Sequence, residues 1–258
     1  CGAEIPLVKQ FWLAKKSGKQ IAYRPVVDKA AKKVTFELLE NTALKKSGFD
    51  PNEGTVTRGD ARCPVCEQVV PATDTRRLAR EGQMGERMVA VILHHPDQTG
   101  KKYRLATEAD AAVFARAQVR LQEKIANWPY LESPLPEEEL PEDGTLGFRV
   151  NKYGMLQWKD LFNGRQQLAL ITFLDKVKGS YGRIQAECER IEMGVGGTAV
   201  GKNHRNSFSV SIVGYLATIF DQITLKNNAL ARWNNIAEKT EYLISTIAIP
   251  MKWDFSEV

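Results

Sequence analysis

The segment Cys63-Pro64-Val65-Cys66 constrains the fold of this chain more than any other short stretch of its sequence. Two thiolates separated by two residues can both point into one tetrahedral metal site, as in a zinc knuckle. The residues on either side, 55–58 and 68–71, are predicted to be short strands, which suits a zinc ribbon. A redox-active Cys-x-x-Cys normally opens a helix after a strand, and inert thiols are the other alternative. The pattern therefore favours zinc.

A third cysteine opens the chain, and its surroundings mirror those of Cys66. Cys1 and Cys66 each lie four residues ahead of an aliphatic residue followed by proline, Ile5-Pro6 and Val70-Pro71. We therefore expect Cys1, Cys63 and Cys66 to bind one structural zinc ion, with the last ligand of a closed site expected before Cys1. A chain that begins with Cys is expected to be a segment of a longer protein, and lipoprotein processing is the alternative.

The remaining candidate ligands are weaker. His94, His95 and His204 are possible substitutes, but adjacent histidines on a strand point to opposite faces, so at most one of the first two would bind. Cys188 falls on the apolar stripe of a predicted helix, where a buried structural thiol is expected. Four cysteines in 258 residues do not suggest a disulfide scaffold, and we expect a reducing, cytoplasmic environment.

The hydrophobic period changes along the chain, from strand-like to helix-like. Strands are predicted over residues 5–8, 20–27, 33–39, 55–58, 68–71, 87–93 and 101–105. Thr107 and Asp110 then form a variant capping box, which predicts a helix start. Further helices are predicted over 158–162, over 165–191, through Val213, Leu216, Phe220 and Ile223, and over 240–249. We expect an α+β fold, with a β-rich, zinc-ribbon-like N-terminal part followed by a mainly helical C-terminal part.

Residues 131–143 carry three prolines and six acidic residues, which predicts an extended connection. The predicted domains are a β-rich basic domain ending in a helix over 1–130, an acidic linker over 131–143, and a helical domain over 144–258. The most apolar run, 208–220, is interrupted by Ser, Gly and Thr and is shorter than the roughly 20 residues of a membrane span. We therefore expect no membrane partner.

The charge is divided unevenly between the two parts. Residues 1–104 contain 19 Lys and Arg against 12 Asp and Glu, whereas residues 105–258 contain 17 against 19. The net positive charge therefore lies in the first part, which would attract a polyanion such as DNA. A solvated surface without a partner is the alternative.

Two motif-like segments lack the context that their chemistry requires. Residues 196–202 have the spacing of a phosphate-binding loop, but Asn203 replaces the Ser or Thr that would hold magnesium, and a polar helix precedes them. Residues 127–130, Asn-Trp-Pro-Tyr, resemble the Asn/Asp-Pro-Pro-Tyr motif of amino-methyltransferases, with Trp in place of the first Pro. They follow a helix instead of a strand, so we expect a loop that ends the helix and is anchored by an aromatic residue. The sequence has no Gly-x-Ser-x-Gly, His-Glu-x-x-His or candidate triad, so we expect no catalytic residue in this chain.

Several collinear segments resemble the zinc-ribbon-containing adenine-specific DNA methylases of the DUF1156 type. The resemblance covers nearly the whole chain. The matching segments are CGAEIPLVKQFWLAKK, RPVVD, GTVTRGDARCPVC, GERMVAVI, YRLATEAD, YGMLQWKDLFNGRQQLAL, NNALARW and PMKWDFSE. The chain departs from the family pattern at Gly164, where proline is expected, and in the knuckle cysteine expected before Cys1.

The resemblance implies that this chain is the insert between the two halves of a methyltransferase core. In that family the glycine-rich motif that binds S-adenosylmethionine precedes this segment, and the Asp-Pro-Pro-Tyr catalytic motif follows it. The chain by itself would then be inactive, and its partners would be double-stranded DNA and the remainder of the core. A target-recognition role is implied, because a base methylase must extrude its target from the helix.

Basic residues that flank the ribbon are the candidate DNA contacts, together with two in the loop predicted over 194–206. They are Lys15, Lys16, Lys19, Arg58, Arg62, Arg76, Arg77, Arg80, Lys202 and Arg205. The alternative function is a protein-interaction scaffold of a multi-subunit DNA-modification or defence complex, in which the basic residues only keep the surface solvated.

Overall fold

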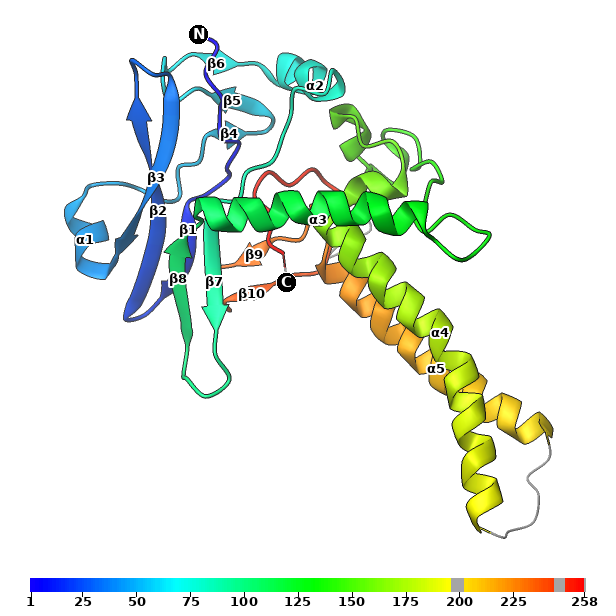
Figure 1. Ribbon diagram of the computed structural model, residues 1–258. Coiled ribbons are helices and arrows are strands. Elements are labelled where there is room, and N and C mark those ends of the chain that lie inside the picture. The colour runs from blue at the N-terminus through cyan, green and yellow to red at the C-terminus, as the bar shows by residue number, and fades with distance from the viewer. Residues whose placement is uncertain (196–201, 244–248, 258) are drawn as a thin grey trace.

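The computed structural model describes residues 1–195, 202–243 and 249–257, and it confirms the α+β class (Figure 1). Strands dominate the N-terminal part and long helices the C-terminal part. The strands are β1 (Trp12–Lys16), β2 (Lys19–Asp28), β3 (Lys33–Glu40), β4 (Val56–Thr57), β5 (Asp60–Arg62), β6 (Val69–Val70), β7 (Ala90–His94), β8 (Lys101–Leu105), β9 (Trp233–Asn234) and β10 (Lys239–Thr240). The α-helices are α1 (Asn41–Lys46), α2 (Ala72–Arg80), α3 (Glu108–Ala126), α4 (Gly164–Val195) and α5 (Lys202–Lys226). Three short 3₁₀ helices are η1 (Thr145–Gly147), η2 (Val150–Tyr153) and η3 (Trp158–Leu161).

The first core lies between two antiparallel units. Strands β1, β2 and β3 form a meander, and the β7–β8 hairpin packs against it. Phe11 is almost fully buried and meets Tyr23 edge-on, with ring centroids 5.3 Å apart. Alternating side chains of β2 and β3 face this core, because successive strand residues point to opposite faces. The apolar alternation that predicted these strands therefore reflects their burial.

The C-terminal part returns to the first sheet. The β9–β10 hairpin lies next to β1, where the indole Nε1 of Trp233 donates a hydrogen bond to the carbonyl oxygen of Leu13 at 2.7 Å. The backbone N–H of Lys15 donates to the carbonyl oxygen of Asn235 at 2.9 Å. The N-terminal sheet and the last quarter of the chain are therefore joined directly.

A second core contains part of the predicted linker. Leu140 is buried together with Phe148, Leu161, Leu230 and Ile249. The N–H of Leu140 also donates to the carbonyl oxygen of Leu156 at 2.7 Å. The end of the segment 131–143 is thus packed, although its composition predicted an extended connection. The domain boundary stays a prediction.

Helices α4 and α5 form a long hairpin that extends away from the body of the molecule (Figure 1). Val213, Leu216, Phe220 and Ile223, predicted to share one face of α5, are all half-buried. Residues Ser207–Lys226 are long and apolar enough, with a mean hydropathy of 1.4, to cross a membrane by length and composition alone. One such helix is weak evidence, so the absence of a membrane partner stays a prediction.

The structure corrects three predicted elements. The loop predicted over 194–206 is wrong at both ends, because α4 continues to Val195 and α5 begins at Lys202, and its residues 196–201 lie outside the described residues. The helix predicted over 240–249 is wrong at its start, because Thr240 pairs with Trp233 in the β9–β10 hairpin, and residues 241–243 are not helical. Residues 244–248 of that prediction lie outside the described residues. Residues 5–8 form no strand, although the carbonyl oxygen of Val8 accepts a hydrogen bond from the N–H of Thr55 at 2.8 Å.

Candidate functional site

The cysteine pair lies in the turn between β5 and β6. The N–H of Cys63 donates to the carbonyl oxygen of Gln68 at 2.9 Å, and the N–H of Glu67 donates to that of Cys63 at 2.8 Å. Glu67 adopts a left-handed backbone with a φ of 63°. These bonds close a tight loop that turns both thiols to one side, as the Cys-x-x-Cys spacing predicts.

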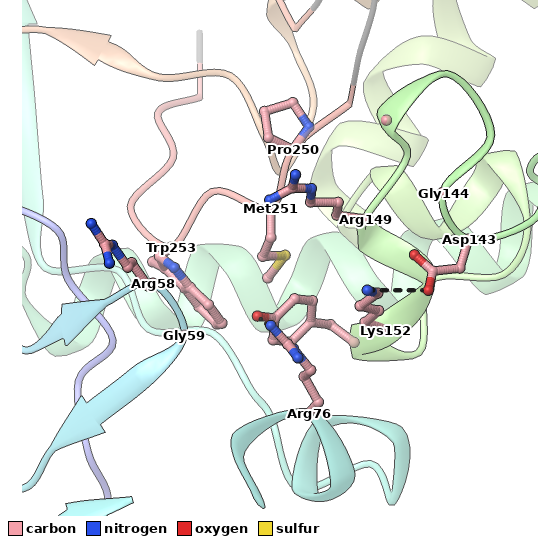
Figure 2. A pocket seen from close by; sticks show the side chains of 12 residues that line it. Arg58, Gly59, Arg76, Asp143, Gly144, Arg149, Lys152, Pro250, Met251 and Trp253 are labelled. Atoms are coloured by element: carbon pink, nitrogen blue, oxygen red, sulfur yellow. Dashed lines mark hydrogen bonds and ion pairs between the residues drawn. The ribbon is translucent and has the colours of Figure 1, made fainter. Parts of the chain in front are cut away.

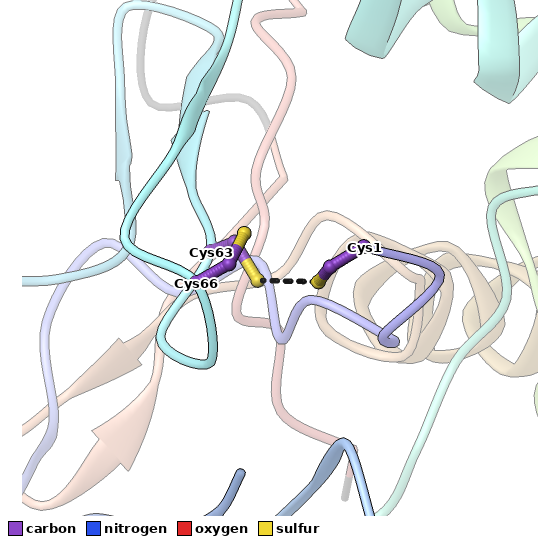
Figure 3. Close-up of side chains that lie close together, drawn as sticks. All are labelled: Cys1, Cys63 and Cys66. Carbon is purple, nitrogen blue, oxygen red and sulfur yellow. Dashed lines mark hydrogen bonds between the residues drawn. The ribbon is translucent and has the colours of Figure 1, made fainter.

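Cys1 completes a group of three thiols (Figure 3). The sulfur atoms of Cys1, Cys63 and Cys66 all lie within 4.8 Å of one another, and those of Cys1 and Cys63 are 3.8 Å apart. Three thiolates at this separation could hold one metal ion, because zinc–sulfur bonds of about 2.3 Å place tetrahedral sulfur ligands under 4 Å apart. The residues predicted as metal ligands are thus brought together.

An apolar shell surrounds the cluster on the protein side. Cys63 and Val65 are buried against Val34 of β3, with Ile5 and Val27 packed beside them. We call strands β4, β5 and β6, with the cysteine loop between β5 and β6, the ribbon. The ribbon therefore packs against the main sheet through the loop that carries two of the thiols. Such a shell limits the access of water to a bound ion and supports its ligands.

The electrostatics of the cluster favour thiolate formation at one position. A hydrogen bond from the backbone of Gln68 lowers the pKa of Cys66, and a bond with Cys63 acts in the same direction. A lowered pKa increases the fraction of thiolate, which is the form that binds metal. Among the described residues, no histidine or carboxylate joins the three thiols, and His94 and His95 lie exposed at the end of the β7 hairpin. The side chain of His204 lies outside the described residues.

A basic cavity of about 390 Å³ lies beside the ribbon (Figure 2). Four segments far apart in sequence line it: the β4–β5 turn, α2, the 3₁₀ region and the irregular C-terminal segment over 250–253. The charged side chains at its wall are Arg58, Arg76, Arg149, Lys152 and Asp143. Four cations thus face one carboxylate.

The ribbon and α2 are linked mechanically. The carboxylate of Asp60 in β5 accepts a hydrogen bond from the N–H of Ala72, the first residue of α2, at 2.7 Å. Gly59, whose φ is 103°, lets the β4–β5 turn approach closely, because an added Cβ would lie 3.1 Å from the hydroxyl of Tyr153. The conformation of the ribbon therefore sets the positions of Arg58 and Arg76 in the cavity wall.

The predicted DNA contacts fall into separate groups in the structure. Arg58 and Arg76 line the cavity, whereas Arg62 and Arg80 are exposed outside it. Arg77 is exposed, and its guanidinium pairs with Asp74 and Glu81 of its own helix at 3.3 and 3.0 Å, so its charge is partly neutralised.

The three predicted lysines lie at the β1–β2 hairpin. Lys16 and Lys19 both pair with the carboxylate of Glu238, and the Nζ of Lys19 lies 2.7 Å from Oε1 of Glu238. Lys15 is exposed and donates to the side chain of Asn52 at 3.0 Å. The side chains of Lys202 and Arg205 lie outside the described residues. Two of the three lysines therefore already have an anionic partner within the chain.

Sequence reasoning missed the half of the cavity that comes from the C-terminal part. The residues missed belong to a region whose net charge is negative, so the charge distribution did not indicate a basic site there; they are Arg149, Lys152, Tyr153 and Trp253. The only available signal was their position within or beside the segments of the family resemblance.

Comparisons with protein-family models, with curated proteins and with solved structures found no match to this chain.

Proposed function

We propose that this chain is the DNA-binding, target-recognition insert of an adenine-N6 DNA methyltransferase that uses S-adenosylmethionine. The cofactor and catalytic motifs belong, in this proposal, to a core that flanks the insert. The chain contributes a zinc-bound ribbon and a basic surface that hold DNA while a base is extruded. It does no chemistry by itself.

The observation that carries the proposal is the connection between the thiol cluster and two arginines that have no carboxylate partner among the described residues. Arg58 lies in the β4–β5 turn of the ribbon, and Arg76 lies on the helix that Asp60 anchors. In the described part of the chain, neither Arg58 nor Arg76 has a carboxylate within ion-pairing distance. The guanidinium of Arg76 donates a hydrogen bond to the neutral hydroxyl of Tyr153 at 3.4 Å, which leaves its charge unbalanced. Guanidinium groups without an internal carboxylate are available for phosphate, which they bind with two parallel hydrogen bonds.

Zinc is the metal that the proposal assigns to the cluster. A site made of thiolates suits zinc, and the tight knuckle with flanking strands is typical of structural zinc. The proposed ion orders the ribbon and does not meet the substrate. Its loss would therefore weaken DNA binding indirectly, by releasing Arg58 and the start of α2.

The test is the salt dependence of duplex DNA binding, measured by fluorescence anisotropy of a labelled oligonucleotide. Four phosphate contacts would lower the affinity about a hundredfold between 50 and 200 mM salt. Arg58→Ala and Arg62→Ala should each reduce the slope by about one unit. Arg116→Ala is the matched control, because Arg116 is exposed on α3, away from the ribbon. Equal affinity at both salt concentrations would contradict the proposal.

A second candidate function is a protein-interaction scaffold, and the α4–α5 hairpin favours it. Large apolar side chains are exposed along the hairpin: Phe173 of α4, and Phe208, Val210, Tyr215 and Ile219 of α5. Exposed apolar patches on a helical surface are typical of interaction sites. In this case DNA binding would be weak, and Arg58→Ala and Arg62→Ala would not change it. Tyr215→Lys would instead abolish assembly with a methylase core subunit.

A further inference from the structure

We propose that the basic cavity receives one unstacked nucleotide of a DNA strand, with its phosphate among the arginines and its base against Trp253. The inference rests on the proposed DNA-binding function and deepens it by naming the site and the unit that is bound. The ligand chemistry is that of a nucleotide: an anionic phosphate joined to a flat aromatic ring.

The unbalanced positive charge of the cavity indicates where the phosphate would bind. Arg149 and Arg76 extend toward Met251 from opposite sides (Figure 2). Within the described ranges, neither guanidinium is paired with a carboxylate, and that of Arg76 donates a hydrogen bond to the neutral hydroxyl of Tyr153 at 3.4 Å. The one carboxylate among the cavity-lining residues is that of Asp143, which Lys152 holds at 3.2 Å. Like charges gathered around one cavity repel each other, so a bound anion would stabilise this arrangement.

The base end of the cavity follows from its aromatic and sulfur side chains. Trp253 and Tyr153 meet at 89° with ring centroids 4.9 Å apart, which fixes the orientation of the indole. Trp253 and Met251 are both half-buried at the cavity wall. An oriented indole is a platform for stacking of a base, and every base has a face that can stack. Sulfur beside an aromatic ring adds a polarizable contact.

The size of the cavity limits what can enter. Its volume of about 390 Å³ falls at the lower end of the roughly 300–1,000 Å³ found for small-molecule pockets. One nucleotide fits a cavity of this volume, and a base-paired duplex does not. The bound nucleotide must therefore be out of its stack, either in a single strand or extruded from a duplex.

The first experiment measures anisotropy of a labelled single-stranded oligonucleotide with the full chain and its variants. Arg149→Ala should weaken binding about tenfold, because the variant loses charge-assisted hydrogen bonds to the phosphate. Arg149 has no described side-chain partner, so its loss should leave the fold intact, and thermal melting checks this. Arg116→Ala removes the same charge from α3 and should change affinity by less than about twofold.

A gain-of-function variant separates the cavity from general electrostatics. Asp143→Asn removes the one carboxylate at the wall and frees Lys152. Oligonucleotide binding should tighten about threefold. The matched control is Asp97→Asn, which removes one negative charge from an exposed turn away from the cavity. A similar gain in both variants would overturn the assignment to the cavity.

The indole supplies an independent readout of where the base lies. Binding should quench tryptophan fluorescence, and Trp253→Phe should remove that quenching although the other four tryptophans remain. Phenylalanine keeps an aromatic ring against Tyr153, so the fold should persist. Quenching that is undiminished in Trp253→Phe would overturn the proposal.

Competition distinguishes the possible sources of the anion. Free deoxyadenosine monophosphate should displace the oligonucleotide at lower concentration than inorganic phosphate does. Equal displacement by both would mean that only phosphate is bound, which overturns the nucleotide assignment. If DNA binding depends on salt but is unchanged in Arg149→Ala, the proposed function is kept and the assignment of the nucleotide to the cavity is overturned. A chain that binds no DNA at low salt would remove the proposed function itself.

Discussion

The ammonium of Lys19 lies 2.7 Å from the carboxylate oxygen Oε1 of Glu238, a residue 219 positions further along the chain. Lys16 binds the other carboxylate oxygen, and the hydroxyl of Tyr103 donates to Oε1. The side chain of Glu238 is only 8% exposed. One buried carboxylate therefore joins the β1–β2 hairpin, strand β8 and the β9–β10 turn.

We predict that Glu238→Gln lowers the free energy of unfolding at pH 7 by about 1–2 kcal/mol, the range for losing charge-assisted hydrogen bonds. Burial alone would raise the pKa of Glu238, but hydrogen bonds from Lys16, Lys19 and Tyr103 outweigh burial and lower it to about 2. The folded state therefore favours the charged form. The stabilisation is present above the unfolded pKa of 4.5 and is lost as the pH falls toward 2.

Urea denaturation at pH 7 and pH 3 measures this effect. The difference between the variant and the original chain should shrink at the lower pH. Lys15→Gln is the control, because Lys15 is exposed and bonds to the neutral side chain of Asn52. A Glu238→Gln difference that is constant with pH would show that the carboxylate charge is not responsible.

Local signals predicted those parts of the structure that local chemistry determines. The hydroxyl of Thr107 accepts a hydrogen bond from the N–H of Asp110, and the carboxylate of Asp110 accepts one from the N–H of Thr107, which is the predicted capping box. Strand β8 spans the predicted residues 101–105. The spacing of Cys63 and Cys66 likewise predicted a shared site, because two residues between them suffice to form the loop.

Distant pairings could not be predicted from local pattern. Thr240 belongs to an apolar stretch that suits a helix, yet it pairs with Trp233, whose indole is anchored on Leu13. Arg149 and Trp253 share a cavity only because four separate segments converge there. Nothing in the residues adjacent to either one indicates that convergence.

We predict that Cys63→Ser abolishes the metal binding proposed for the cluster and lowers the melting temperature by about 5 °C, as expected when about 2 kcal/mol is lost from a chain of this size. Three thiols within 4.8 Å supply the ligands, and a hydroxyl is a poor substitute for a thiolate. Elemental analysis and thermal melting are the measurements. Cys188→Ser is the matched control, since Cys188 is a half-buried thiol of α4 outside the cluster. Equal metal content in both variants would exclude this site.

We predict that Glu67→Gly stabilises the ribbon by about 0.5–1 kcal/mol, measured by chemical denaturation of the metal-loaded chain. Glu67 has a φ of 63°, a left-handed conformation that costs a residue with a Cβ about 1–2 kcal/mol. Glycine adopts it without strain but loses more entropy on folding, which reduces the net gain. The ion pair of Glu67 with Lys29 is exposed and contributes little. Gln68→Gly, at the neighbouring position, should destabilise the chain, and an equal gain from both changes would contradict the argument.

The last prediction concerns the carboxyl group of Asp254, next to the proposed stacking residue Trp253. Burial raises the pKa of Asp254 to about 6, although Lys9, Arg232 and Lys252 act against the rise. In the pH range from 3.8 to about 6, the folded chain therefore holds a proton that the unfolded chain releases. The stabilisation from that proton is fully present below pH 3.8 and is lost as the pH rises through about 6.

Asp254→Asn should consequently raise the free energy of unfolding at pH 7.5 by about 1–2 kcal/mol. This gain is smaller than the free energy that corresponds to the whole pKa shift, because Asp254 is half-buried and solvent screens its charge. The gain should decline as the pH is lowered toward 4, where the original carboxyl group is neutral as well. Asp50→Asn provides a contrast of opposite sign, because hydrogen bonds from Asn52 lower the pKa of Asp50. Urea denaturation of both variants from pH 4 to pH 7.5 measures the effect. A stability gain for Asp254→Asn that is the same at every pH would mean that burial of the charged carboxylate is not its cause.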